Sequence, residues 1–250
     1  MDSAALYKHI LMMAKEDKNV LGFVLEGSRG KGAETKYSDY DVYIIVKNGM
    51  AKRYKKLFDV KRNDFDISVM DFDTFKTEAE FGGEWAWNRY SYAHIKAQID
   101  KNGLIQKLVE EKSRIPKDKL RKYIEGTLDG YINFVYRSLK CLRDGKKVGF
   151  RLEAEREIPL FVDLLFALER KVSPYYKYLD WELRNYPIKS FPMSSNEIIS
   201  SIMKISTTGD YKTQQRLLCV CHKVFGAMGY EKVFDGWTKE KIHWMETVKL

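Results

Sequence analysis

The sequence predicts an α+β protein, with a small mixed sheet and its flanking helices followed by an all-helical bundle. Three short segments are rich in Val, Ile, Tyr and Phe, as strands are. They span residues 20–25, 40–46 and 65–70. All three precede Pro116, and beyond it the apolar residues recur at helical spacing. We therefore expect a sheet-containing domain at residues 1–115 and a helical domain at residues 116–250.

Helical periodicity accounts for most of the remaining chain. In the first domain, helices are expected at residues 4–15, 74–99 and 104–112, the middle one broken at Gly82-Gly83. In the second domain, long helices are expected at residues 120–142 and 152–168, and Pro159 should bend the latter. Shorter helices should begin near Tyr175, Ser195, Thr213 and Thr238.

The charge balance favours anionic partners. Lys and Arg total 44 and Asp and Glu total 35, giving a formal net charge of +9. A basic surface suits a nucleoside triphosphate and RNA equally well. The three cysteines are too few and too irregularly spaced for a disulfide framework or a zinc site. The sequence contains neither a signal peptide nor an apolar run long enough to cross a bilayer, so we expect a cytoplasmic protein without a membrane partner.

The informative pattern begins with Gly27 and Ser28, followed after ten intervening residues by Asp39, Tyr40 and Asp41. Side chains alternate along a strand, so Asp39 and Asp41 should point to the same face. Two neighbouring carboxylates repel each other unless a cation lies between them. Hard oxygen ligands suit Mg²⁺ or Mn²⁺.

A third carboxylate lies on the third expected strand. Phe65 and Ile67 should face the core, which places Asp66 on the opposite face. If this strand pairs with residues 40–46, Asp66 joins Asp39 and Asp41 in one patch. Such a patch can hold metal ions that bridge triphosphate oxygens and an attacking hydroxyl.

The turn at Gly27 and Ser28 should supply the anion-binding half of the site. A small-residue turn at the start of a helix presents backbone N–H groups to a phosphate. Ser28 adds a hydroxyl, and Arg29 and Lys31 add positive charge, although either cation can equally be solvated.

The Gly27-Ser28 turn, the Asp39 and Asp41 pair, and the later Asp66 together resemble the signature of the DNA polymerase beta-type nucleotidyltransferase superfamily. This superfamily includes aminoglycoside and lincosamide nucleotidyltransferases, CCA-adding enzymes and minimal antitoxin nucleotidyltransferases. The resemblance implies transfer of a nucleoside monophosphate, AMP from ATP or another triphosphate, to a hydroxyl. It also implies that all three aspartates are metal ligands and that Gly27 and Ser28 bind the triphosphate.

The helical half resembles the second domain of drug-type nucleotidyltransferases, in residues 164–168 and 174–179. Members of this kind often use a carboxylate to deprotonate the acceptor hydroxyl, and in some of them it comes from that domain. Glu153 is the favoured candidate, with Glu155 next, and a solvated charged helix face is the alternative. Lys177 is expected to reach the nucleotide, unless its stem simply packs on the core.

Three classes of function remain open from the sequence. The favoured one is a small-molecule nucleotidyltransferase, its acceptor an antibiotic or a similar compound. The second modifies RNA or a protein, as tRNA-tailing and antitoxin enzymes do, and salt-sensitive RNA binding would favour it. The third is an inactive nucleotide-binding module, against which the complete set of carboxylates argues. Trp85, Trp87, Tyr90 and Tyr92 are expected to pack in the core rather than to stack on a base.

Overall fold

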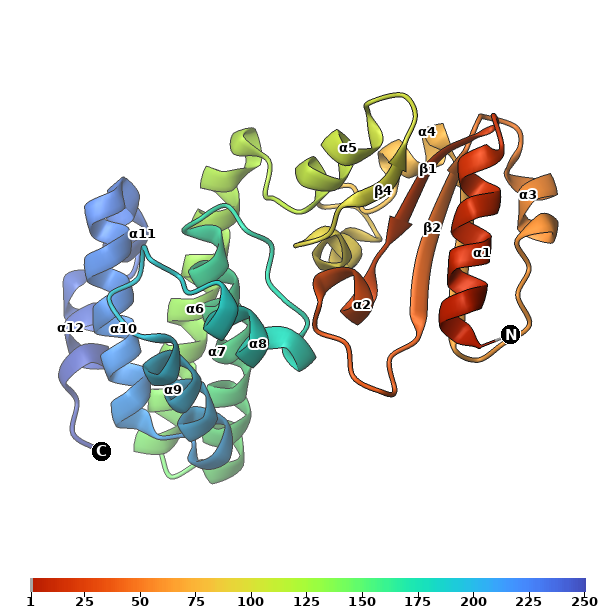
Figure 1. Ribbon diagram of the computed structural model, residues 1–250. Coiled ribbons are helices and arrows are strands. Elements are labelled where there is room, and N and C mark those ends of the chain that lie inside the picture. The colour runs from red at the N-terminus through yellow and green to blue at the C-terminus, as the bar shows by residue number, and fades with distance from the viewer. Residues whose placement is uncertain (1) are drawn as a thin grey trace. The chain divides into compact units, whose positions relative to one another are not determined.

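A computed structural model describes residues 2–250 and has the expected α+β architecture (Figure 1). The chain divides between Pro116 and Lys117 into two compact units. The first unit contains the whole sheet, and the second is helical. The fold class predicted from the sequence is therefore confirmed.

The sheet has four strands, in the order β3-β2-β1-β4. They are β1 (Val20–Leu25), β2 (Tyr40–Val46), β3 (Phe65–Asp71) and β4 (Ala97–Asp100). β2 and β3 run parallel, whereas β1 is antiparallel to both of its neighbours, β2 and β4. The sheet is therefore mixed, as expected, and the three strands predicted from composition are confirmed.

The expectation of helix across residues 74–99 was largely wrong. This segment contains the end of α4 (Phe72–Thr77), a 3₁₀ helix, η1 (Ala86–Tyr92), and most of β4. β4 pairs along the free edge of β1, and the carboxylate of Asp100 accepts the backbone N–H groups of Ile105 and Gln106 at 3.2 and 3.0 Å. Asp100 thus ends the strand and begins α5 (Ile105–Lys112).

Helices cover both faces of the sheet. α1 (Ser3–Glu16) and α3 (Ala51–Leu57) contribute to one apolar core, which takes Val42, Ile44 and Val46 from β2. α4, α5 and η1 contribute to a second core, which takes Tyr43 and Ile45. The alternation along β2 therefore directs Asp41 to the same face as Tyr43 and Ile45, away from α1.

The second unit consists of helices joined by short connections. They are α6 (Lys117–Arg143), α7 (Lys147–Ala167), α8 (Tyr176–Asn185), α9 (Ser195–Thr208), α10 (Tyr211–Phe225), η2 (Gly226–Tyr230), α11 (Glu231–Asp235) and α12 (Lys239–Thr247). The predicted helices are confirmed, whereas η2 and α11 were not expected. Among residues 2–250, no helix combines the length and hydropathy that a membrane span requires.

Candidate active site

The turn after β1 places Gly27 against the start of β2. Gly27 begins the short helix α2 (Gly27–Lys31) with a φ of +62°, a left-handed conformation that favours glycine. A Cβ atom at Gly27 would lie 2.9 Å from Cγ of Asp41 and would overlap its carboxylate oxygen. In addition, the backbone N–H of Glu26 donates to the carbonyl oxygen of Asp41 at 2.9 Å. The hydrogen bond from Glu26 and the close approach that glycine allows place the turn directly beside the Asp41 carboxylate.

Asp66 lies on the other side of Asp41. In the parallel pairing of β2 with β3, Asp41 is the register partner of Asp66, just as Tyr40 is the partner of Phe65. Asp66 is exposed, whereas its strand neighbour Phe65 is buried, in agreement with the predicted alternation. Gly27, Asp41 and Asp66 therefore lie in a row across the adjacent ends of three strands.

Asp39 precedes β2 by one residue and is exposed. Among residues 2–250, no group of three or more His, Cys, Asp or Glu side chains is already arranged to hold a metal ion. Asp41 and Asp66 are register partners on neighbouring strands, and carboxylate oxygens are ligands of the kind that suit a hard divalent cation.

The neighbouring acid Asp64 has different partners. Arg62 donates from Nε and Nη2 to both of its carboxylate oxygens at 2.8 Å, and the hydroxyl of Ser3 also donates to it. These contacts lower the pKa of Asp64 to about 2, mainly through the hydrogen bonds from Arg62 and Ser3. The charge of Asp64 is thus already balanced, which separates it from Asp66 two residues later.

Arg29 and Ser28, beside the turn, differ in their contacts, and only Arg29 holds the loop that leads into β2. The guanidinium of Arg29 donates to the carbonyl of Ser38 at 2.7 Å and to that of Asp39 at 3.0 Å. It also lies 4.1 Å from the ring centre of Tyr40. Arg29 therefore anchors the backbone that carries Asp39. The hydroxyl of Ser28 makes no hydrogen bond within residues 2–250, so it can bind a ligand.

Lys31 has a structural role that the sequence does not reveal. Its side chain is buried, and its ammonium donates to the carbonyl oxygens of Tyr90, Ser91 and Ala93 at 3.0, 3.0 and 2.5 Å. The expectation that Lys31 adds charge near the turn or is simply solvated is therefore wrong. It ties α2 to the end of η1 instead.

Glu26, directly before Gly27, was not singled out from the sequence. The pKa of Glu26 is raised to about 8, mainly by burial and also by the nearby charges of Asp41 and Glu78, while hydrogen bonds to Ser91 and Tyr43 oppose the shift. Asn88 extends this polar network, because its amide donates to Tyr43 at 2.9 Å and to Glu78 at 2.8 Å. The network thus connects the turn with β2 and η1.

The four aromatic residues at positions 85–92 behave in two ways. Tyr90 and Tyr92 are buried, as expected. Trp85 and Trp87 are 57% and 62% exposed, and their ring centres are 5.8 Å apart, so core packing was wrong for the tryptophans. They precede the well-packed part of η1, at the end of a connection that contains Gly82 and Gly83.

The candidates from the helical half all lie in the second unit. Oε1 of Glu153 pairs with Nη2 of Arg137 at 2.5 Å, whereas its Oε2 is buried and without a hydrogen-bond partner among the described residues. Glu155 is exposed and lies 3.6 Å from Arg151. Lys177 is exposed, with its ammonium 4.9 Å from the ring centre of Tyr178. The structure thus gives Glu153 a fixed environment and leaves Lys177 at the surface.

Comparisons with known proteins give limited information. No protein-family model matches the chain, and no curated protein matches its sequence. One similar solved structure is a nucleotidyltransferase-like protein from Exiguobacterium sibiricum, with 9% sequence identity and a TM-score of 0.41. The match covers 94% of this chain and 74% of the other. At this level the likeness carries no conclusion about function.

Proposed function

We propose that this chain is a metal-dependent nucleotidyltransferase that moves AMP from ATP to a hydroxyl group of a small-molecule acceptor. The observation that carries the proposal is the row formed by Gly27, Asp41 and Asp66. Any side chain at Gly27 would displace the Asp41 carboxylate, and Asp66 is the register partner of Asp41 on the next strand. The resemblance of these residues to the nucleotidyltransferase signature supports the same assignment.

Gly27 and Ser28 would bind the triphosphate. Because Gly27 has no side chain, the Asp41 carboxylate can lie directly against the turn, and the hydroxyl of Ser28 can donate to a phosphate oxygen. Arg29 would act through the loop that it anchors, by holding Asp39 beside Asp41. Bound nucleotide would thus lie against the edge of the sheet where the carboxylates meet.

Asp41 and Asp66, with Asp39, would hold the divalent cation, Mg²⁺ or Mn²⁺. When bound, the cation supplies positive charge that offsets the charge on the phosphates in the transition state. The carboxylates also orient the reacting groups, and catalysis of this kind depends mainly on positioning. The oxygen of the acceptor hydroxyl forms a bond to the α-phosphorus, the bond from that phosphorus to the oxygen of the β-phosphate breaks, and pyrophosphate leaves.

Glu153 is the proposed acceptor of the hydroxyl proton. One of its oxygens pairs with Arg137, and its second oxygen has no hydrogen-bond partner among the residues described. Glu155 is the alternative, and its exposure leaves it less well oriented. Lys177, also exposed, would contribute a mobile positive charge to the nucleotide.

The proposed acceptor is small because the second unit mixes acids among its basic residues, whereas a long RNA favours a continuous basic track. Carboxylates and aromatic rings suit a hydroxylated, cationic compound such as an aminoglycoside. Transfer to tRNA or to a protein is the second candidate, and it shares the same first unit.

The test is an incubation of the protein with Mg²⁺, ATP and separate pools of hydroxylated small molecules, tRNA and protein. ATP labelled at the α-phosphate is compared with ATP labelled at the γ-phosphate. We expect label from the α-position, and not from the γ-position, to appear on a small molecule whose mass increases by one AMP residue. The Asp66→Asn variant should produce no labelled product.

Two outcomes would contradict the proposal. Transfer of the γ-label would identify a phosphotransferase instead of a nucleotidyltransferase. Labelling of tRNA or protein, with no small molecule labelled, would replace the proposed acceptor with the second candidate and leave the roles of Asp41 and Asp66 intact.

A further inference from the structure

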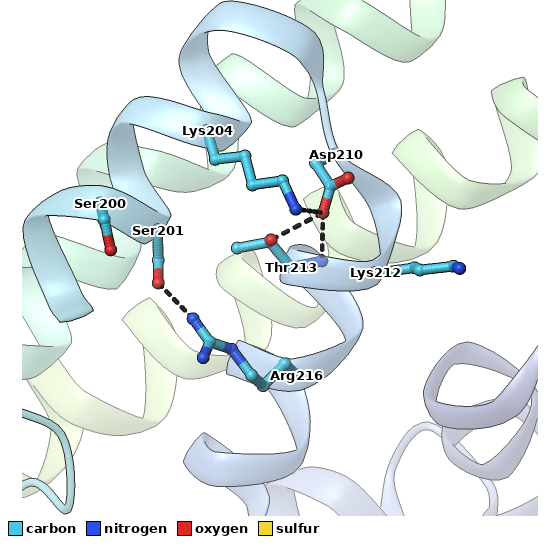
Figure 2. Close-up of a pocket in the computed structure, with 7 residues that line it drawn as sticks. All are labelled: Ser200, Ser201, Lys204, Asp210, Lys212, Thr213 and Arg216. Atoms are coloured by element: carbon cyan, nitrogen blue, oxygen red, sulfur yellow. Dashed lines mark hydrogen bonds and ion pairs between the residues drawn. The ribbon is translucent and has the colours of Figure 1, made fainter.

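A polar cavity of about 340 Å³ lies between α9 and α10 in the second unit (Figure 2). Three cationic side chains, Lys204, Lys212 and Arg216, contribute to its lining, together with one carboxylate, Asp210. The remaining lining groups carry hydroxyls. This volume is at the small end of ligand-binding pockets, and the cations outnumber the acid.

Asp210, the single acid that lines the cavity, already has partners within the protein. Oδ2 of Asp210 accepts the backbone N–H of Thr213 at 2.9 Å and its hydroxyl at 2.7 Å, and so caps the start of α10. The ammonium of Lys204 lies 3.1 Å from the same oxygen. Figure 2 shows these three interactions meeting at one carboxylate oxygen. Asp210 therefore does not balance the other two cations.

Arg216 has no ion-pair partner in the described part of the chain. One of its terminal nitrogens donates to the hydroxyl of Ser201 at 2.7 Å, which is a neutral partner. The acid Glu197 belongs to the capping box of α9, where the backbone N–H and hydroxyl of Ser194 donate to its Oε2 at 2.8 and 2.7 Å. These hydrogen bonds lower the pKa of Glu197, and the charge of Arg216 lowers it further, so the two residues interact electrostatically without forming a direct ion pair. Most of the donors of the Arg216 guanidinium therefore remain for a ligand.

Lys212 stands at the rim of the cavity. It is exposed, and within residues 2–250 it makes neither an ion pair nor a side-chain hydrogen bond. In Figure 2 it extends away from Lys204 and Arg216. A flexible lysine in this position raises the local positive potential without occupying the cavity.

We propose that this cavity binds the phosphate group of a small phosphate monoester. Arginine matches phosphate because its planar fork can donate two parallel hydrogen bonds, and Lys212 adds charge at the rim. The hydroxyl of Ser201 accepts from Arg216 and donates to the carbonyl oxygen of Glu197 at 2.6 Å, so it holds the guanidinium in place beside the cavity. Every residue of this site belongs to α9, α10 or the turn between them, so it is a binding site made by the second unit alone.

The test uses ribose 5-phosphate as the probe and ribose as the uncharged control, both added to the full chain at constant ionic strength during calorimetric titration. We expect saturable binding of ribose 5-phosphate and none of ribose. Arg216→Gln should weaken the binding by about tenfold or more, because it removes a charge-assisted hydrogen bond. Lys212→Gln should have a smaller effect.

Lys223→Gln is the matched control. Lys223 also lies on α10 and is exposed, but it does not line the cavity, so this variant should bind as the wild type does. Circular dichroism and thermal melting check that each variant is folded.

Several results would overturn the proposal. One is binding of the phosphate probe that Arg216→Gln leaves unchanged in a folded protein. Another is an equal loss in Arg216→Gln and Lys223→Gln, which would indicate general charge attraction. A single-stranded RNA oligonucleotide that binds more tightly than ribose 5-phosphate, and depends on Arg216, would assign the cavity to nucleic acid.

Discussion

The carboxyl carbon of Asp41 lies 2.9 Å from the position that a Cβ atom would occupy on Gly27. The two residues are fourteen positions apart in the sequence, and the pairing of β1 with β2 brings them together. Gly27 therefore meets two requirements, a positive φ and the absence of a Cβ atom where the Asp41 carboxylate lies. The first is common in turns, whereas the second ties this glycine to the proposed chemistry.

Replacement of Gly27 should affect both stability and turnover, the first through the positive φ and the second through the position of Asp41. Gly27→Ala should cost about 1 kcal/mol of stability for the left-handed backbone, and it should also displace Asp41. We expect turnover to fall by about 100-fold or more, since an ångström of displacement at a reacting centre has that effect. Steady-state kinetics and thermal unfolding measure the two effects.

Gly32 provides the matched control. Its φ is +68°, yet a Cβ there would meet nothing within 4 Å. Gly32→Ala should therefore show a similar loss of stability with near-normal turnover. Equal turnover in the two variants would show that the space beside Asp41 is not needed.

The two acids at the start of β3 should respond differently to neutralisation. Asp66→Asn should lower turnover by about 1,000-fold, equal to about 4 kcal/mol in the transition state, because it removes a proposed metal ligand. Asp64→Asn should lose the exposed pairing with Arg62 and weaken the contact with Ser3, with little effect on stability, and should keep its turnover. If Asp64→Asn were the inactive variant, the assignment within this segment would be reversed.

The glutamates of α7 should also differ in their effects. Glu153→Gln should reduce turnover by about 100-fold or more while ATP affinity remains constant, because a general base acts on the acceptor and not on the nucleotide. Glu155→Gln should change turnover little. Full activity of Glu153→Gln would remove Glu153 from the mechanism, and a loss confined to Glu155→Gln would assign its role to that residue.

Glu157 should make stability depend on pH. Its carboxylate oxygens are buried with no hydrogen-bond partner among the described residues, and burial raises its pKa well above 4.5. The folded state keeps the Glu157 proton at pH values where the unfolded chain has lost it. The contribution of Glu157 to stability is therefore greatest below pH 4.5 and declines as the pH rises toward its folded-state pKa.

Glu157→Gln should remove that decline. Thermal unfolding between pH 5 and pH 8 should show that the melting temperature of the variant exceeds that of the wild type by an amount that grows with pH. Each kcal/mol of stability corresponds to about 2–4 °C. Glu155→Gln, at an exposed position on the same helix, should follow the wild type. An advantage that is constant across this range would show that Glu157 does not titrate as described.

The parts of the fold that depend on local patterns could be predicted from the sequence. The apolar run from Val42 to Val46 and the alternation from Phe65 to Val69 indicated two strands, and their parallel pairing placed Asp66 beside Asp41 as expected. β4 was missed because the nearby glycines and aromatic residues were taken for an interrupted helix. Ile95, Ala97 and Ile99 alternate with Lys96 and Gln98, and this period of two was the available signal.

The features that depend on distant contacts could not be predicted in this way. Lys31 is buried because three backbone carbonyls from the end of η1 converge on its ammonium, and no local pattern encodes that contact. The environment of Glu26 also depends on a distant contact, because its hydrogen-bond partner Ser91 lies in η1. Lys31 and Glu26 are single charged residues beside a glycine turn, and the local sequence does not indicate that either one contacts η1.

The central claim is that Asp41 holds a cation with the nucleotide beside Gly27. Calorimetric titration of ATP into the full chain tests this directly, with and without Mg²⁺, and it requires no knowledge of the acceptor. We predict that wild-type protein and Asp64→Asn bind ATP much more tightly with Mg²⁺ than without it, and that Asp41→Asn loses this difference. Equal, Mg²⁺-independent binding of ATP to wild type and to folded Asp41→Asn would contradict the account.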